Sequence, residues 1–364
     1  MFTESTLRKL LDFSANDPVV SVYLNTEPSK GNAEEHRLRL RSLLKDMSLK
    51  QDEEAIERFF NHSYDWSGRG VAVFSCAPAG FFHHITLSLP VNDEIVIGGQ
   101  PEIKPLLGLV DNYGGYGVVL IDKQNARLFL FQQGELVEKQ SISGETVKHI
   151  KTGGRILGQR DGTVESSRTQ DEVVDRNMRE LAELVMKYFE EKHIRRMMIG
   201  GSEENIAAFK GQLSKAWLSL ILGTFSVSMN AGLGEILDKS LAVNRKAEME
   251  HEEALVNDLI TSAAKESAAV VGLEDTLDAV SNGRVQKLVF TEGLSAHGYW
   301  HRDCGLLTTL AIRKHHACPD PAIRVDDVVS LAATAVLKSG GSVEVLHPGS
   351  ALDEHEKIGA VLRY

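Results

Sequence analysis

The chain has 364 residues, of which 42% are hydrophobic and 25% are charged. These values are ordinary for folded globular proteins and exclude a disordered or fibrous chain, while the length predicts two or three domains rather than one core. The net charge of −11 argues against a protein that coats nucleic acid with its whole surface, but it leaves room for a local basic segment.

Three cysteines are too few for a disulfide framework, which favours a reducing compartment. The sequence holds no apolar run long enough for a transmembrane helix, so we expect none. Its first residues lack the apolar core and the cleavage site of a signal peptide. The cytoplasm is therefore the expected location.

Residues 1–109 predict an α+β domain, because helical and strand patterns are mixed along this region. The patterns predict a helix with Leu7, Leu10 and Leu11 on one face, a strand over 19–24, two charged helices within 33–61, strands over 70–76 and 81–89, and a short helix over 102–109.

Residues 110–240 predict a central α/β domain. Three strands over 116–122, 126–132 and 135–143 are separated by turn signals, which indicates a meander. A long loop, 144–168, then leads into a long helix, a buried strand over 195–201 and a further helix that Ser202 caps. This order of strands and helices favours an RNase H-like domain.

Residues 241–364 predict an α/β sandwich that begins with a linker helix. The expected order is a helix over 273–281, a strand over 285–291, a His/Cys insert over 296–322, a helix over 325–338, and strands over 342–347 and 359–364. The predicted fold class is thus a multidomain α/β protein.

The loop contains the sequence KHIKTGGRILGQR, which we call the basic segment (residues 148–160). It holds four cations and no acidic residue, namely Lys148, Lys151, Arg155 and Arg160. Lys and Arg displace counterions from a phosphate backbone, and long loops in compact domains are commonly functional. The basic segment therefore predicts nucleic-acid contact, which Arg168, Arg176 and Arg179 would extend onto the next helix. The alternative is an ordinary solvated surface loop.

The insert carries two H-x-x-C pairs. Zinc prefers four Cys or His ligands in a tetrahedral array, and two ligands two residues apart share one turn. The candidate ligands are His301, Cys304, His315 or His316, and Cys318. The alternative is that Cys304 and Cys318 are plain thiols in a variable insert.

Other chemistry has weaker support. Gly200-Gly201-Ser202 lacks the spacing of a phosphate-binding loop and is better interpreted as a helix cap. A nuclease on the RNase H-like scaffold would need clustered carboxylates, for which Asp122, Asp171 and Glu172 are candidates. Asp122 is more simply a turn residue.

The C-terminal region resembles the last domain of archaeo-eukaryotic class-1 release factors and Pelota. The similarity lies in VVGLEDTLDAVSNGRVQKLVFTEGL (270–294), GGSVEVLH (340–347) and IGAVLRY (358–364). It implies the fold of the kink-turn-binding ribosomal proteins at the C-terminus. The His/Cys insert falls where some members of the family carry a small zinc ribbon, which implies a structural zinc as the one possible cofactor.

The central region resembles the same family's RNase H-like domain, whose catalytic loop carries Gly-Gly-Gln after a Lys-His stretch. Here Lys148-His149 is followed by Gly153-Gly154-Arg155, and a glutamine comes later, in Gly158-Gln159. The resemblance implies a translation factor for peptide release or ribosome rescue, with the ribosome, ribosomal RNA and tRNA as partners. In that role Gln159 would position water and the basic segment would hold RNA. The alternative is a non-catalytic RNA- or ribosome-binding protein that has lost Gly-Gly-Gln.

Overall fold

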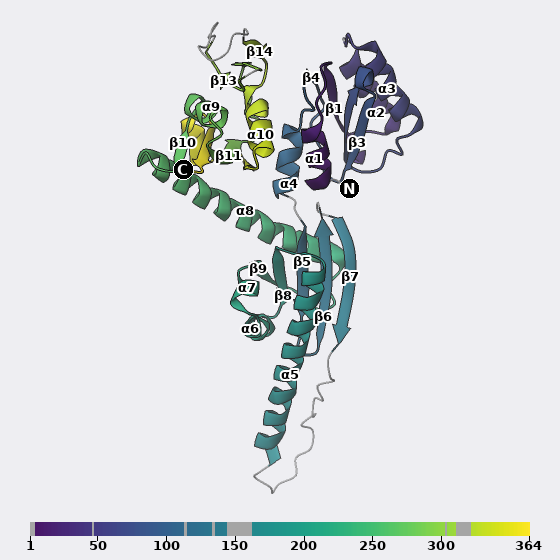
Figure 1. Ribbon diagram of the computed structural model, residues 1–364. Coiled ribbons are helices and arrows are strands. Elements are labelled where there is room, and N and C mark those ends of the chain that lie inside the picture. The colour runs from purple at the N-terminus through teal and green to yellow at the C-terminus, as the bar shows by residue number, and fades with distance from the viewer. Residues whose placement is uncertain are drawn as a thin grey trace. The chain divides into compact units, whose positions relative to one another are not determined.

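A computed structural model describes residues 4–45, 47–112, 115–132, 135–143, 162–302, 304–310 and 322–364. It divides into two compact units, one made of Met1–Asn112 with His251–Tyr364 and the other of Tyr113–Glu250 (Figure 1). The second is called the central unit. Each unit combines helices with β-sheet, so the predicted α/β class is confirmed. The RNase H-like and ribosomal-protein-like assignments stay predictions. Among the described helices, none combines the length and the apolar character needed to cross a bilayer.

The N-terminal part of the first unit is an antiparallel sheet in the order β3-β2-β1-β4. Its elements are α1 (Glu4–Asp12), β1 (Val19–Asn25), α2 (Ala33–Leu44), α3 (Lys50–His62), β2 (Gly70–Cys76), β3 (Phe81–Leu87), β4 (Glu94–Gly98) and α4 (Lys104–Asn112). Side chains of α2 and α3 pack on one face of β1 and β2, as Leu40 and Phe60 do against Val22 and Val73.

The C-terminal part is a mixed sheet in the order β10-β16-β11-β15, in which β11 and β15 are parallel. Its elements are the second half of α8 (Leu233–Ala264), β10 (Ala269–Val271), α9 (Leu273–Ser281), β11 (Val285–Thr291), α10 (Val328–Lys338), β15 (Ser342–Leu346) and β16 (Ile358–Leu362). The predicted insert forms a small sheet of β12 (Gly298–Trp300), β13 (Leu307–Thr308) and β14 (Ile323–Val325).

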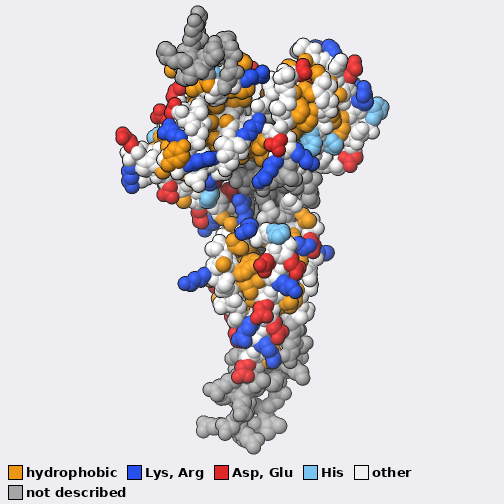
Figure 2. Space-filling view, viewed as in Figure 1, with side chains coloured by type: hydrophobic (Ala, Val, Ile, Leu, Met, Phe, Trp, Pro, Cys, Tyr) orange, Lys and Arg blue, Asp and Glu red, His pale blue; other side chains and the backbone are white. Residues whose placement is uncertain are grey.

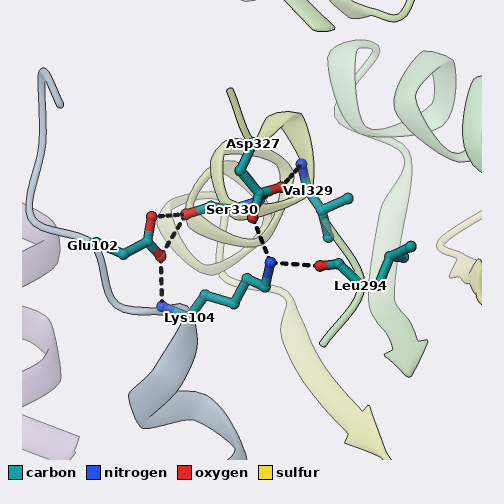
Figure 3. Close-up of polar contacts among 6 residues, drawn as sticks. All are labelled: Glu102, Lys104, Leu294, Asp327, Val329 and Ser330. Carbon is teal, nitrogen blue, oxygen red and sulfur yellow. Dashed lines mark hydrogen bonds and ion pairs between the residues drawn. The ribbon is translucent and has the colours of Figure 1, made fainter. Parts of the chain in front are cut away.

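One hydrophobic core joins these two parts of the first unit, because it includes Leu10 and Leu106 together with Val329 and Val345. A polar network lies beside that core (Figure 3). Lys104 Nζ donates to the carbonyl of Leu294 and to the Asp327 carboxylate. That carboxylate also accepts from the backbone N–H of Val329 at 3.0 Å, so it caps α10.

Glu102 completes the network. Its two carboxylate oxygens accept from Ser330 Oγ at 2.7 Å, and one of them accepts from the Lys104 N–H at 2.9 Å (Figure 3). Burial raises the pKa of Glu102, even though these hydrogen bonds oppose the shift. The network therefore ties residues 102–104 to the start of α10 through groups that are mostly out of water.

The central unit is a five-stranded sheet in the order β7-β6-β5-β8-β9. Its elements are β5 (Tyr116–Ile121), β6 (Asn125–Gln132), β7 (Glu135–Ser143), α5 (Gly162–Glu191), β8 (Met197–Gly201), α6 (Glu203–Gly211), α7 (Lys215–Leu218), β9 (Ile221–Ser226) and the first half of α8. The first three strands form the predicted antiparallel meander, and β5, β8 and β9 run parallel. Helices α5 and α6 cover one face and α8 the other (Figure 1).

Several predictions need correction. The predicted loop ends earlier than residue 168, because α5 already begins at Gly162. The strands β4, β9 and β10 were not predicted, since they are short, lie at sheet edges and lack a clear alternation of buried and exposed side chains.

We expect Glu102→Gln to remove one source of pH-dependent stability. Because the folded-state pKa of Glu102 is raised, its contribution is complete below the ordinary value of 4.5 and is lost as pH rises through the raised pKa. The amide of the variant would keep an acceptor oxygen without a charge. The free energy of unfolding, measured by urea titration from acid to neutral pH, should therefore fall less for the variant than for the wild type. The exposed Glu54→Gln in the same unit is the control, and parallel curves for Glu102→Gln and wild type would refute the prediction.

Candidate nucleic-acid interface

The residues predicted to bind RNA or to catalyse hydrolysis lie outside the described part of the chain. They are Lys148, His149, Lys151, Gly153, Gly154, Arg155, Gly158, Gln159 and Arg160. The structure describes the two elements that flank them, the edge strand β7, which ends at Ser143, and α5, which begins at Gly162.

Helix α5 is much longer than the strands it covers. Its 30 residues correspond to about 45 Å, whereas the eight residues of β6 span about 27 Å. The helix is anchored by its second half, since Met178, Leu181, Val185 and Phe189 are buried in the core. The start of α5 consequently extends past the sheet (Figure 1), and the basic segment directly precedes it in the sequence.

Two side chains fix α5 and the β5–β6 turn to one another. Asn177 is fully buried, and its Nδ2 donates to the carbonyl of Lys123 at 3.2 Å. In the same turn the Asp122 carboxylate accepts from the N–H groups of Gln124 at 2.7 Å and Asn125 at 2.6 Å. Asp122 is therefore a turn residue, as expected. No group of three metal-ligating side chains occurs within the residues that the structure describes.

The described part of α5 is not a uniformly basic surface. Arg179 pairs with Asp175 at 3.0 Å, and both side chains are exposed. Glu172, Glu180 and Glu183 are also exposed, and Figure 2 shows acidic side chains among the basic ones on this face. Arg176 and Arg179 thus lie among acidic side chains and do not continue the basic segment as a purely basic surface. The side chain of Arg168 lies outside the described residues.

The Gly200-Gly201-Ser202 sequence forms a cap rather than a ligand loop. Ser202 Oγ accepts from the N–H of Asn205 at 3.3 Å at the start of α6. A Cβ at Gly201 would lie 2.6 Å from the carbonyl oxygen of Ile121, so glycine is needed here for close strand packing. The helix-cap interpretation is confirmed.

The first predicted zinc pair forms the turn between β12 and β13. His301 is 1% exposed, its N–H donates to the Leu306 carbonyl at 2.9 Å, and its carbonyl accepts from Gly305 at 2.8 Å. Cys304 is disulfide-bonded, and a zinc site would need its reduced form because the thiolate is the ligand. His315, His316 and Cys318 lie outside the described residues, so the zinc site stays a prediction.

A second group of basic side chains was missed by the sequence analysis. Lys192, His193, Arg195 and Arg196 lie between α5 and β8, where they line a cleft. Four basic residues within five positions were a visible signal. The segment was interpreted only as the start of a strand, and its partner Glu138 comes from β7, far away in sequence.

Comparison with known proteins supports the resemblance. Residues 101–245 match the family model described as bacterial archaeo-eukaryotic release factor family 10. The eukaryotic peptide chain release factor subunit 1 of Oxytricha trifallax is 25% identical over 224 residues, which is 58% of this chain and 48% of that protein. Over residues 101–245 the chain is therefore similar to the archaeo-eukaryotic release factors.

Another curated relative and two solved structures also align with this chain. The peptide chain release factor subunit 1 of Methanocaldococcus jannaschii is 22% identical over 201 residues, covering 54% of this chain and 47% of that protein. The chain spans about half the length of the curated relatives that it matches. Among solved structures, Dom34 of S. cerevisiae, a translation termination-like factor, aligns over 81% of this chain and 79% of its own with 12% identity and a TM-score of 0.42. The archaeal termination factor aRF1 aligns over 99% and 96% with 14% identity and a TM-score of 0.25.

We expect Asp122→Ala to lower the free energy of unfolding of the central unit by about 1–2 kcal/mol, because two backbone N–H groups lose their acceptor. Asp122→Asn keeps an acceptor oxygen and should lose little stability in the same urea titration. A metal-dependent nuclease would behave differently, since Asn is a poor replacement for a metal-binding carboxylate. Magnesium-dependent RNA cleavage that Asp122→Asn abolishes would contradict the turn role.

Proposed function

We propose that this protein is a cytoplasmic, ribosome-associated translation factor of the release or rescue type, which brings the basic segment to ribosome-bound RNA. The observation that carries the proposal is the family match over residues 101–245, which includes the basic segment and both elements that flank it. The curated relatives named as release factors point to the same class.

The composition of the basic segment suits contact with RNA. Lys148, Lys151, Arg155 and Arg160 supply four cations, and the segment holds no carboxylate that would neutralise them. Gly153, Gly154 and Gly158 have no side chain, so they permit a close approach of the backbone to RNA. Binding should therefore depend on phosphate neutralisation and on salt, with ribosomal RNA and tRNA as the expected partners.

Peptidyl-tRNA hydrolysis is the activity proposed for Gln159. Water would attack the carbonyl carbon of the ester, the bond to the tRNA oxygen would break, and the peptide would leave as a carboxylic acid while the tRNA regains its hydroxyl group. Gln159 would orient the water with its side-chain amide, and Gly158 would let the backbone enter a narrow site.

A non-catalytic binding protein is the second candidate. It is favoured by Arg155, which occupies the third position after Gly153-Gly154 where the family's hydrolytic motif has glutamine. An arginine there adds a phosphate-binding cation but no water-positioning amide. The two candidates share RNA binding and differ only in peptide release.

We expect Lys151→Glu with Arg155→Glu to weaken co-sedimentation with ribosomes strongly, and wild-type binding to decrease steadily as salt is raised. Lys215→Glu with Lys246→Glu is the matched control, because it changes the charge of the same unit equally at exposed positions away from the basic segment. Equal loss in both double variants would point to a general charge effect. Failure of the wild type to bind ribosomes at low salt would reject both candidate functions.

Gln159→Ala separates hydrolysis from binding. If Gln159 positions the water, release of labelled peptide from stalled ribosome complexes should fall by roughly 10²-fold or more, while co-sedimentation stays as in the wild type. Release that is unaffected by Gln159→Ala would reject the catalytic role of Gln159. If the wild type releases no peptide but binds ribosomes, the non-catalytic candidate is correct.

A further inference from the structure

The cleft missed by the sequence analysis lies at the end of the central unit opposite to the start of α5. The strands β5, β7 and β8 begin at this end and β6 ends here, whereas β7 ends and α5 begins at the other. The 30 residues of α5 correspond to about 45 Å. The cleft and the start of α5 are therefore separated by about the length of that helix.

The cleft has the size of a small-ligand site. Its volume is about 540 Å³, within the range of small-molecule pockets. Val137 and Ile194 contribute apolar surface to it, and Val137 is 47% exposed. A cleft of this volume, with apolar surface beside cations, suits a nucleoside with its phosphate.

The charge of the cleft is positive, since Lys192, Arg195 and Arg196 line it against one carboxylate, that of Glu138. Lys192 Nζ donates to Glu138 at 2.6 Å, and this hydrogen bond lowers the pKa of Glu138, which keeps it ionised and paired. Arg195 is exposed and forms no ion pair with the described residues. The guanidinium of Arg195 is thus available to an anionic ligand.

His193 is held at the mouth of the cleft in a strained conformation. It follows the last turn of α5 with a φ of 54°, and the N–H groups of His193 and Ile194 bond to the carbonyls of Glu190 and Phe189. This is the Schellman ending, in which glycine is the usual residue because a Cβ is unfavourable at positive φ.

The same chain ends α9 and α10 in the same way, and there it uses glycine, Gly283 and Gly340. A histidine at this position of α5 therefore costs stability that glycine would not cost. Strained residues cluster at ligand-binding sites, and His193 is flanked in sequence by cations of the cleft, unlike Glu266, which has the same conformation elsewhere.

We propose that this cleft binds one nucleotide of a single-stranded RNA, with the phosphate on Arg195 and His193 and the base against Val137 and Ile194. The choice of RNA as the source of the nucleotide rests on the proposed function. The nucleotide site itself rests on the cleft alone. It gives the central unit a second RNA contact, at the end of α5 away from the basic segment.

The test uses the full chain carrying Lys151→Glu and Arg155→Glu, so that the basic segment contributes little, and a fluorescein-labelled RNA hexanucleotide. In this background Arg195→Glu should weaken binding, measured by fluorescence anisotropy, at least fivefold. His193→Gly should weaken binding about threefold while it raises the melting temperature by about 2–4 °C, because it relieves the strain at positive φ. Replacing a residue with a purely structural role would not weaken RNA binding while it raises the melting temperature.

Glu266→Gly is the matched control. Glu266 ends α8 with a φ of 50° and the same pair of hydrogen bonds, so its replacement should raise the melting temperature similarly and leave RNA binding unchanged. Hexanucleotide binding that neither Arg195→Glu nor His193→Gly alters would overturn the proposal. Displacement of the RNA by micromolar adenosine monophosphate would overturn RNA as the ligand and indicate a free nucleotide.

The two proposals fail in different ways. If the wild type does not sediment with ribosomes but Arg195→Glu still weakens hexanucleotide binding, the proposed function is wrong and the nucleotide site is supported. If ribosome binding depends on Lys151 and Arg155 while the cleft variants bind the hexanucleotide as their parent does, the proposed function is supported and the cleft proposal is wrong.

Discussion

The packing of α5 on the sheet of the central unit is the interaction on which both proposed RNA contacts depend. Its second half is buried against β5, β6 and β8 through side chains such as Leu181, Val185 and Phe189. Burying each such side chain contributes roughly 1.5–3 kcal/mol. This anchor leaves the start of the helix beyond the sheet, next to the basic segment, and fixes its last turn beside β7. If α5 slid by one turn, both ends would lose their positions.

Much of the fold follows from local sequence. Helix α9 and strand β11 were predicted at their observed bounds, because Leu277 and Val280 recur at helical spacing and Leu288, Val289 and Phe290 form a buried run. The edge strands β4 and β9 lack such a pattern, since a strand exposed on one side accepts many side chains. Their pairing depends on the neighbouring strand rather than on their own residues.

The candidate sites were predictable only where one segment supplies the chemistry. The basic segment is contiguous, so its charge could be seen in the sequence. The cleft combines Glu138 from β7, Val137 beside it and the cations that follow α5, and only the tertiary structure brings these together. His193 illustrates the same limit, because its positive φ is a property of the helix ending and not of the residue type.

The basic segment and the cleft are two local groups of cations in a chain whose net charge is −11. The chain carries more acidic than basic residues. At physiological salt, charges act over only about 8 Å, so remote acidic residues do not cancel a local basic cluster. Under the two proposals RNA is attracted at the basic segment and at the cleft, but not to the mixed charges of α5. Two attractive points, one in the sequence before α5 and one after its last turn, separated by a stretch with an excess of carboxylates, would define an orientation on RNA. A uniformly basic protein would bind more tightly but in many orientations, which would not suit the proposed role of placing one glutamine at one ester bond.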